Sequence, residues 1–268
     1  MDLQEVIRLA AAMGNDVTID GLRYYITDKV EVKCVDKGIK KAEILNGVES
    51  IPDSAFSKCK KLKEVKIPDS VTQIGSFVFS ECKKLKNVEF PDSIVRMGST
   101  VFCDCQNLES VKLPKGITRI PALMFDGCIK LRDVCMPESV YNIDEYAFRN
   151  CRNLINIKLS NDLFWINHSA FGGCVLLQDI TLPEDLSGIG DFAFIGCESL
   201  TSLTIPRKVH YIGEGSFQEC SRLRYIKIPK RLKRVIITSF DTRDIPSWLK
   251  LFVPLRLLKK SDVRWEFY

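Results

Sequence analysis

Apolar residues recur along this chain with a fixed period, which is plainest in its phenylalanines. Phenylalanine occupies every 23rd position from Phe56 to Phe240, nine positions in all. In the first eight units a cysteine follows three residues later and a leucine six residues later, as Cys59 and Leu62 do in the first. No insertion breaks this register. A fixed period of this length predicts a solenoid, because one such unit cannot bury its own apolar side until neighbouring units stack on it.

Each unit also carries the pattern of one short strand. Two apolar columns are separated by a single residue, as Val65 and Ile67 are, which is the alternation of a half-buried strand. Proline follows this strand in seven units, and Ser160 replaces it in one. Because proline cannot donate the next ladder hydrogen bond, the strand is expected to end there. The units then stack around a core of Phe, Leu and Val or Ile columns.

The repeated unit resembles the BspA-type leucine-rich repeat family, whose pattern reads Ile-Pro-x-x-Val-x-x-Ile-Gly-x-x-Ala-Phe-x-x-Cys-x-x-Leu-x-x-Val. The stretch from Ile67 to Gly75 and the stretch from Tyr146 to Leu154 match it closely. The resemblance covers residues 44–240, about eight repeats. It implies a leucine-rich-repeat solenoid, a curved, β-rich α/β horseshoe with a non-catalytic role in binding other macromolecules. Many members of the family are surface or secreted proteins of bacteria and protozoa.

The two flanks are predicted to cap the solenoid, because its end repeats would otherwise expose their core. Residues 1–43 form the N-terminal cap, with a short helix over residues 2–13. A β-hairpin follows around Asp20-Gly21, and a further strand is expected over residues 30–35. Residues 241–268 form the C-terminal cap, in which a helix begins near Asp244 and ends or kinks at Pro254.

Composition excludes several classes of protein. The chain has 268 residues, 46% hydrophobic and 27% charged, with a mean hydropathy of −0.01. This is typical of a folded chain with an ample core and excludes intrinsic disorder.

Arg8 interrupts what would be the apolar part of a secretory signal, and no apolar run reaches the roughly 18 residues of a membrane span. The sequence as written therefore predicts a cytoplasmic monomer, while the family resemblance leaves a secreted or surface location open.

The eleven cysteines and two histidines invite a metal or redox interpretation, which their spacing does not favour. Zinc sites need closely spaced pairs, whereas these thiols recur once per unit. We expect free core thiols whose S–H groups face loop carbonyls, with Cys135 exposed and the most reactive. His168 and His210 fall in different columns, so they support neither a metal site nor an acid–base pair. The sequence therefore predicts no enzyme, no metal and no cofactor.

Aromatic residues gather in two neighbouring columns in the middle of the chain. These columns bring Tyr141 beside Phe164, and they place Trp165 and Tyr211 on either side of Gly188. The four rings are predicted to line a notch that binds a partner, because interface anchors favour aromatic side chains. The alternative is that the rings lie flat on the surface as ordinary packing. A further aromatic column is predicted to be turn packing and comprises Phe77, Leu123, Tyr146 and Phe192.

Charge is unevenly distributed. The chain carries 39 Lys and Arg against 34 Asp and Glu, a net charge of +5, yet residues 222–268 hold 13 Lys and Arg against 4 Asp and Glu. A basic patch is predicted in this stretch, formed by Arg222, Arg224, Lys227, Lys230, Arg231, Lys233 and Arg234. Residues 248–260 mix apolar and basic side chains and could lie on an anionic membrane. The terminal cap accounts for the same apolar residues, so neither a membrane nor a nucleic-acid partner is favoured.

Three functions follow from these patterns. The first is a non-catalytic scaffold that binds a protein partner through Tyr141, Phe164, Trp165 and Tyr211. The second is a cell-surface adhesin or host-interaction module whose export signal is absent from this chain. The third is a binder of nucleic acid or membrane surfaces through its basic end, which would depend steeply on salt.

Overall fold

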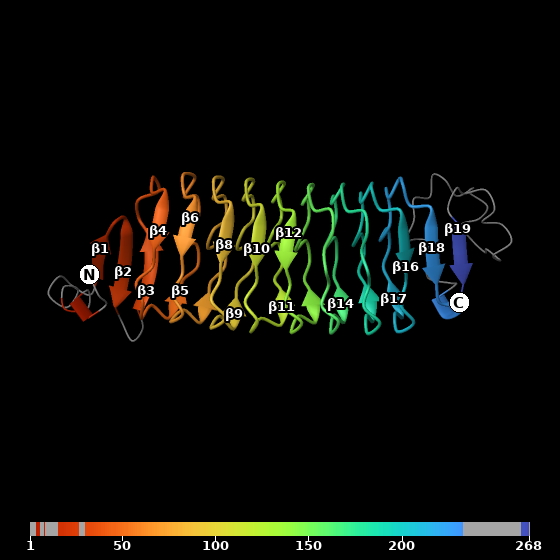
Figure 1. Cartoon of the computed structure of the whole chain (residues 1–268), viewed down its shortest axis with the longest axis horizontal. Coiled ribbons are helices and arrows are strands. Elements are labelled where there is room, and N and C mark those ends of the chain that lie inside the picture. The colour runs from red at the N-terminus through yellow and green to blue at the C-terminus, as the bar shows by residue number, and fades with distance from the viewer. Residues whose placement is uncertain (1–3, 6–7, 9–15, 27–29, 233–263, 268) are drawn as a thin grey trace.

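The computed structural model describes residues 4–5, 8, 16–26, 30–232 and 264–267. Successive turns of the chain stack side by side from the N-terminal to the C-terminal end, and together they form an elongated rod (Figure 1). Strands of adjacent turns pair in parallel and keep the repeat register, as Val111 does with Val134. The predicted solenoid and its register are confirmed.

Most turns cross the rod as two short strands, and in two turns the first strand is reduced to a single bridge between Asn156 and Asp179. The first follows the predicted Val/Ile alternation and is formed in β4 (Lys41–Glu43), β6 (Glu64–Lys66), β8 (Asn87–Glu89), β10 (Ser110–Lys112), β12 (Asp133–Cys135), β16 (Ser202–Thr204) and β18 (Tyr225–Ile228). The second is formed in β5 (Ser50–Ile51), β7 (Gln73–Ile74), β9 (Arg96–Met97), β11 (Arg119–Ile120), β13 (Asn142–Ile143), β14 (Trp165–Ile166), β15 (Gly188–Ile189) and β17 (Tyr211–Ile212).

The prediction of one strand per unit was therefore incomplete. The second strands are only two residues long, too short for an alternating pattern to reveal them in the sequence. They persist because each turn offers its neighbour a partner in the equivalent position, as β13, β14 and β15 do in succession.

Tight turns replace the helices that the α/β expectation required. In residues 30–232 the one helix is the 3-10 helix η1 (Lys230–Leu232). Two positions in each turn have left-handed backbone, for example Phe77 with φ of 59° and Glu81 with φ of 59°. A non-glycine residue seldom adopts this conformation, and it cannot continue a right-handed helix. Each run of short i to i+3 hydrogen bonds consequently stops before an α-helix forms.

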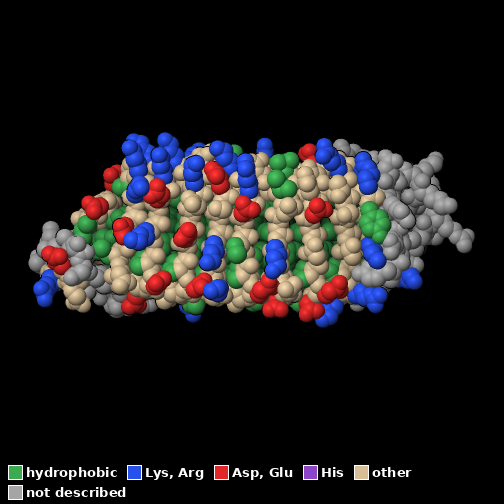
Figure 2. Space-filling view, viewed as in Figure 1, with side chains coloured by type: hydrophobic (Ala, Val, Ile, Leu, Met, Phe, Trp, Pro, Cys, Tyr) green, Lys and Arg blue, Asp and Glu red, His purple; other side chains and the backbone are tan. Residues whose placement is uncertain are grey.

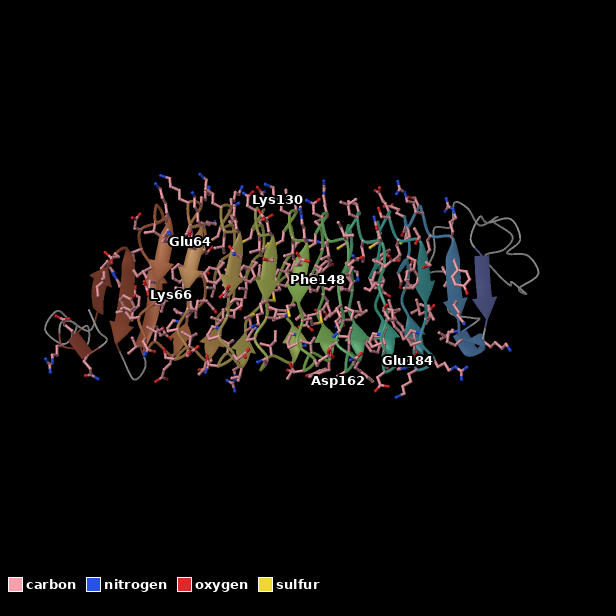
Figure 3. All side chains as sticks on the ribbon, in the orientation of Figure 1. Glu64, Lys66, Lys130, Phe148, Asp162 and Glu184 are labelled. Atoms are coloured by element: carbon pink, nitrogen blue, oxygen red, sulfur yellow. The ribbon has the colours of Figure 1, made fainter. Side chains whose placement is uncertain are left out.

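The core is a set of columns that run along the rod. Phe148 is fully buried and stacks between Phe125 and Phe171, with ring centroids 5.2 and 5.1 Å away (Figure 3). The cysteine column lies beside it, and the Sγ of Cys128 donates to the carbonyl oxygen of Phe102 at 3.1 Å. The expected position of the column thiols in the core, with S–H groups that face carbonyls, is confirmed from Cys82 to Cys220.

The described ends of the rod differ from its repeats. At the N-terminal end, β1 (Asp16–Ile19) and β2 (Leu22–Ile26) form the expected hairpin, and β2 also pairs antiparallel with β3 (Val30–Cys34). At the other end, β19 (Arg264–Phe267) pairs parallel with β18. The predicted helices of both caps lie mainly outside the described residues, and both stay predictions.

Candidate functional site

The second strands place the four predicted aromatic residues in two adjacent columns of the rod, with Trp165 and Tyr211 inside strands and Tyr141 and Phe164 just before them. Trp165 opens β14 and pairs with Gly188 of β15, which in turn pairs with Tyr211 of β17. Phe164 precedes Trp165, and its backbone N–H donates to the carbonyl of Tyr141 on the adjacent turn at 2.8 Å. We call Tyr141, Phe164, Trp165 and Tyr211 the aromatic surface.

The indole of Trp165 fills the notch that the sequence predicted. A Cβ atom at Gly188 would lie only 2.3 Å from the Trp165 ring, so the indole rests directly on the glycine backbone. It then stacks on Tyr211 across the missing side chain, with ring centroids 5.8 Å apart and planes inclined by 19°. The rings therefore form a ridge rather than a hollow, because a large ring gains more contact by covering exposed backbone than by standing in water.

The other rings leave a substantial apolar area in contact with solvent. Phe164 is 53% exposed, Tyr141 50% and Tyr211 41%. Phe164 packs at a tilt against Trp165, with centroids 6.3 Å apart. The structure thus brings Phe164, Trp165 and Tyr211 into contact and places Tyr141 on the neighbouring turn.

Polar contacts fix the Tyr211 end of the aromatic surface. The phenol of Tyr211 donates to Oδ1 of Asp191 at 3.0 Å, and this hydrogen bond, with some desolvation, raises the pKa of Tyr211. His210 meets the edge of Trp165, and its Nδ1 lies 2.9 Å from Oγ of Ser187. The hydrogen bond from Tyr211 and the ring contact of His210 restrain the surface before any partner arrives, which lowers the entropic cost of binding.

A second group of rings, on the tight turns, was only partly anticipated. Tyr146 and Phe192 belong to the column that was predicted to be turn packing, and both contact His168, at centroid distances of 5.0 and 5.8 Å. The guanidinium of Arg149 lies 4.6 Å above the Tyr146 ring and makes two hydrogen bonds to the carboxylate of Asp126. These contacts fit turn packing. His168 takes part in that packing, which its position in the repeat did not indicate.

The predicted basic patch lies partly outside the described residues. Arg222, Arg224 and Lys230 are exposed, and Lys227 is half-buried in β18. Nothing is described for the side chain of Arg231. The remaining members, Lys233 and Arg234, lie beyond the described part of the chain.

A different concentration of positive charge lies nearer the N-terminal end. The lysine ridge, as we call it, occupies one edge of the rod and comprises Lys60, Lys61, Lys63, Lys83, Lys84 and Lys86 (Figure 2). Lys130, in the same column as Lys61 and Lys84, marks this edge in Figure 3. Among the described residues only Lys86 of the six has an ion-pair partner, Glu109 at 3.6 Å. In the sequence, the stretch Cys-Lys-Lys-Leu-Lys occurs twice, one repeat apart, and indicates this ridge. The net charge of residues 1–221 does not reveal it, because carboxylates elsewhere in that stretch offset the lysines.

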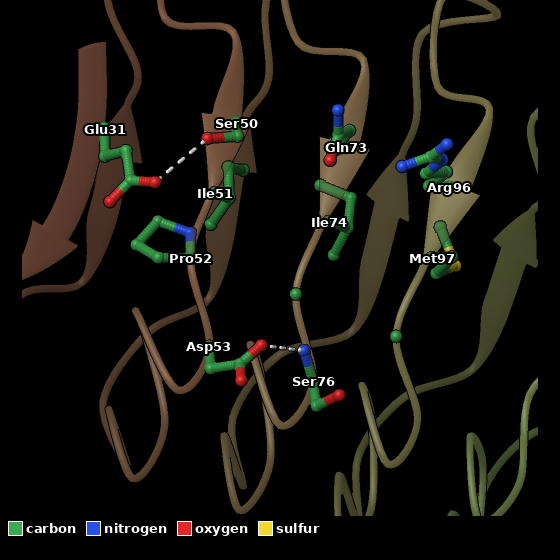
Figure 4. Close-up of a pocket in the computed structure, with 12 residues that line it drawn as sticks. Glu31, Ser50, Ile51, Pro52, Asp53, Gln73, Ile74, Ser76, Arg96 and Met97 are labelled. Carbon is green, nitrogen blue, oxygen red and sulfur yellow. Dashed lines mark hydrogen bonds between the residues drawn. The ribbon is translucent and has the colours of Figure 1, made fainter. Parts of the chain in front are cut away.

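Two hollows lie toward the N-terminal end. One has a volume of about 640 Å³ and runs across β5, β7 and β9 (Figure 4). Its polar groups bond to one another, since Oδ1 of Asp53 accepts from the Ser76 N–H at 2.6 Å and Glu31 lies 3.4 Å from Ser50. The other, of about 630 Å³, borders β4 and β6.

Among the residues that the structure describes, no group of three or more His, Cys, Asp or Glu side chains could hold a metal ion. No helix formed by these residues is long and apolar enough to cross a membrane.

Comparison with known proteins gives a consistent picture. The model of the BspA type leucine rich repeat region matches in six copies, over residues 34–155 and 142–247. A leucine rich repeat protein of T. pallidum is 27% identical, with a TM-score of 0.59 over 82% of this chain and 93% of that one. A leucine rich cell surface protein of Faecalibacterium prausnitzii is 30% identical, with a TM-score of 0.49 over 72% of this chain. This chain spans 60% of the length of the Faecalibacterium protein. Among curated proteins, none matches significantly.

Proposed function

Because this chain belongs to the BspA-type leucine-rich repeat family, we propose that it is a non-catalytic scaffold that binds another protein through the aromatic surface. The observation that carries the proposal is the contact between Phe164, Trp165 and Tyr211 on one edge of a rigid rod, with Phe164 and Tyr211 each more than two-fifths exposed. Rings that are already ordered and still accessible are the anchors that protein interfaces favour.

The backbone beneath the rings supports this role. Strands β13, β14, β15 and β17 pair in one parallel sheet, so the aromatic side chains rise from a common hydrogen-bonded base. A rigid base holds contact residues in place at little entropic cost. The expected partner presents an apolar patch that Phe164 and Tyr141 cover on binding.

A double variant tests the site. Phe164→Ser and Tyr141→Ser together remove exposed rings and leave Trp165 on Gly188, so we expect the fold to be unchanged. Partners captured from a native extract of the source cells should fall at least tenfold for the double variant. Val95→Ser is the matched control, because Val95 is 56% exposed in the same column, two turns from Tyr141. Equal capture by the double variant and the control would exclude the aromatic surface.

The partner could be met inside the cell or at its surface, as in an adhesin or a host-interaction module. Protease treatment of intact source cells separates these cases. Loss of the protein from intact cells would favour the surface role, and protection until lysis would favour the internal one.

A second candidate function rests on the lysine ridge. Six lysines on two adjacent turns form a compact cationic strip with few opposing carboxylates, which fits an anionic polymer lying along the rod. Binding to heparin, used as a sulfated probe, should weaken steeply with salt and fall several-fold in the variant Lys61→Glu/Lys84→Glu. Lys112→Glu/Lys158→Glu changes the charge equally on the first-strand face and should bind almost normally. Equal losses in both variants would show that net charge alone is responsible.

A further inference from the structure

The cysteine column changes its bonding pattern at its first member. From Cys82 to Cys220, each Sγ donates to the carbonyl oxygen of a phenylalanine 26 residues earlier, at 3.0 to 3.3 Å. Cys59 has Lys33 at the corresponding position and makes no such bond. Its Sγ instead lies 3.2 Å from the Sγ of Cys34, a residue that stands outside the repeat register. Among the described residues, this is the one hydrogen bond between two thiols.

The N-terminal cap brings these two thiols together. Cys34 is the last residue of β3, and its backbone N–H donates to the carbonyl of Ala55 at 2.8 Å. This bond holds the end of the strand against the turn that leads to Cys59. Both side chains are buried, at 1% exposure for Cys34 and none for Cys59. The contact therefore belongs to the packing of the cap on the first full turn.

The surroundings favour ionisation of one thiol of the pair. The ammonium of Lys37 lies 3.9 Å from the Sγ of Cys59 and donates to the carbonyl of Ser57. When Cys59 ionises, the Cys34 thiol can hydrogen-bond to the thiolate, so the pKa of Cys59 is lowered and that of Cys34 is raised. Burial raises the pKa of Cys82, the next thiol in the column, to about 12. The lowered pKa favours thiolate, the reactive form, at Cys59, whose Sγ lies 3.2 Å from a second thiol.

We propose that Cys34 and Cys59 are a site of reversible oxidation, which joins the N-terminal cap to the solenoid through a disulfide. The oxidant is a peroxide, here hydrogen peroxide. The Cys59 thiolate attacks one peroxide oxygen, the O–O bond breaks, and the departing hydroxide takes up a proton to become water. The Cys34 sulfur then attacks the sulfenic sulfur of Cys59, the S–S bond forms, and hydroxide leaves with the Cys34 proton as a second water. Two thiols lose two electrons, and one peroxide gains them.

The location suits such a reaction. The pair lies next to the exposed residues Asp36, Lys37 and Gly38, at an end of the rod. The ends of a stack of repeats open more readily than its middle, so a small oxidant reaches this pair before it reaches the interior thiols. The bond would close a loop from residue 34 to residue 59 and restrict the unfolded chain.

Peptide mapping of the full reduced chain tests the proposal directly. The chain is exposed to a modest excess of hydrogen peroxide, unfolded, and alkylated with N-ethylmaleimide before digestion and mass spectrometry. The expected product is a peptide that contains Cys34 joined to one that contains Cys59. The buried thiols of the column interior should be recovered in the alkylated form, namely Cys105, Cys128, Cys151, Cys174 and Cys197. The proposal is overturned if the two thiols are recovered separately, alkylated or oxidised, after the exposed Cys135 has reacted.

Stability provides a second readout. The oxidised chain should melt roughly 5–10 °C higher than the reduced chain, and dithiothreitol should reverse the gain. Cys34→Ser should abolish the gain, whereas Cys82→Ser, a matched change at the next thiol of the column, should keep it. A gain that survives Cys34→Ser would contradict the assignment. If Cys34→Ser does not fold, the peptide map of the unaltered chain decides alone.

Discussion

Inside the phenylalanine column, a residue meets copies of itself on both sides. Phe148 lies between two nearly parallel phenylalanine rings, inclined by 15° and 3°, and has no exposed surface. Phe77, only two residues before the buried Phe79, is 46% exposed on a tight turn. The contribution of a phenylalanine to stability is therefore set by the column in which it lies rather than by its residue type.

This contrast predicts unequal effects of the same substitution. Phe148→Ala should lower the free energy of unfolding by about 3–5 kcal/mol, because it removes buried apolar area and leaves a cavity between fixed rings. Phe77→Ala should change it by no more than about 0.5 kcal/mol. Urea unfolding at neutral pH measures both, and similar losses for the two variants would contradict the described packing.

Cysteine reactivity should follow exposure and pKa in the same way. Cys135 is exposed, whereas burial, with the nearby Asp104 and Asp126 carboxylates, raises the pKa of the half-buried Cys103 to about 11. Iodoacetamide at pH 8 should label Cys135 first, and labelling of Cys103 should accelerate as the pH rises toward 11. Mass spectrometry of the intact and digested protein follows both sites. Rapid labelling of an interior column thiol such as Cys128 at pH 8 would show that the core opens readily.

At the scale of elements, the sequence predicted the strands that alternate and missed those that do not. The spacing of Val65 and Ile67 predicts a first strand, whereas a two-residue strand such as β14 is too short to show any periodicity. The site was predictable to a similar degree. The columns showed that Trp165 and Tyr211 flank Gly188, but the rotamer that lays the indole on the glycine depends on side-chain packing, which no spacing encodes.

The sheet under the aromatic surface should respond to a single methyl group. Gly188→Ala places a Cβ where the Trp165 ring now lies, so the indole must leave its stack on Tyr211 and enter solvent. Tryptophan fluorescence should shift to longer wavelength without a large loss of stability. Gly172→Ala is the control, because its Cβ would meet the Ile195 side chain at 3.1 Å. Identical emission from both variants would argue against the Trp165 contact.

At the scale of the whole molecule, the buried thiols act as one titrating system. Burial raises the pKa of Cys82, Cys174 and Cys220 to about 12, from an ordinary value of 9.0, and raises those of Cys105, Cys128, Cys151 and Cys197 well above it. Below pH 9 these thiols are protonated in both the folded and the unfolded chain. As the pH rises past 9, the unfolded chain loses these protons first, so the folded state loses stability.

This linkage predicts pronounced sensitivity to alkali. Between pH 9 and pH 10 each buried thiol should lower the free energy of unfolding by about 1 kcal/mol. The whole set should therefore lower it by several kcal/mol. Urea midpoints measured from pH 7 to pH 10.5 give the slope. The variant Cys128→Ala/Cys151→Ala should be less stable at pH 7 but should lose about 2 kcal/mol less over that pH unit, because two of the titrating thiols are gone. An unchanged midpoint from pH 7 to pH 10 would refute the linkage.

Charge at this scale was the least predictable property. A net charge cannot show which loops share an edge of the rod. The lysines of two neighbouring turns were therefore counted together with carboxylates that lie elsewhere. The repeat period contained the missing information, because it places Lys61 beside Lys84.

The pairing of β19 with β18 has a consequence for self-association. Residues 264–267 occupy the place that the first strand of another turn would take, with Tyr225 opposite Arg264. A parallel strand that ends a stack offers its free backbone groups to any matching strand, including one from a second molecule, and repetition of that contact builds fibres. By pairing with β18, β19 occupies the backbone groups of that strand, so β18 is not open to a strand of a second molecule.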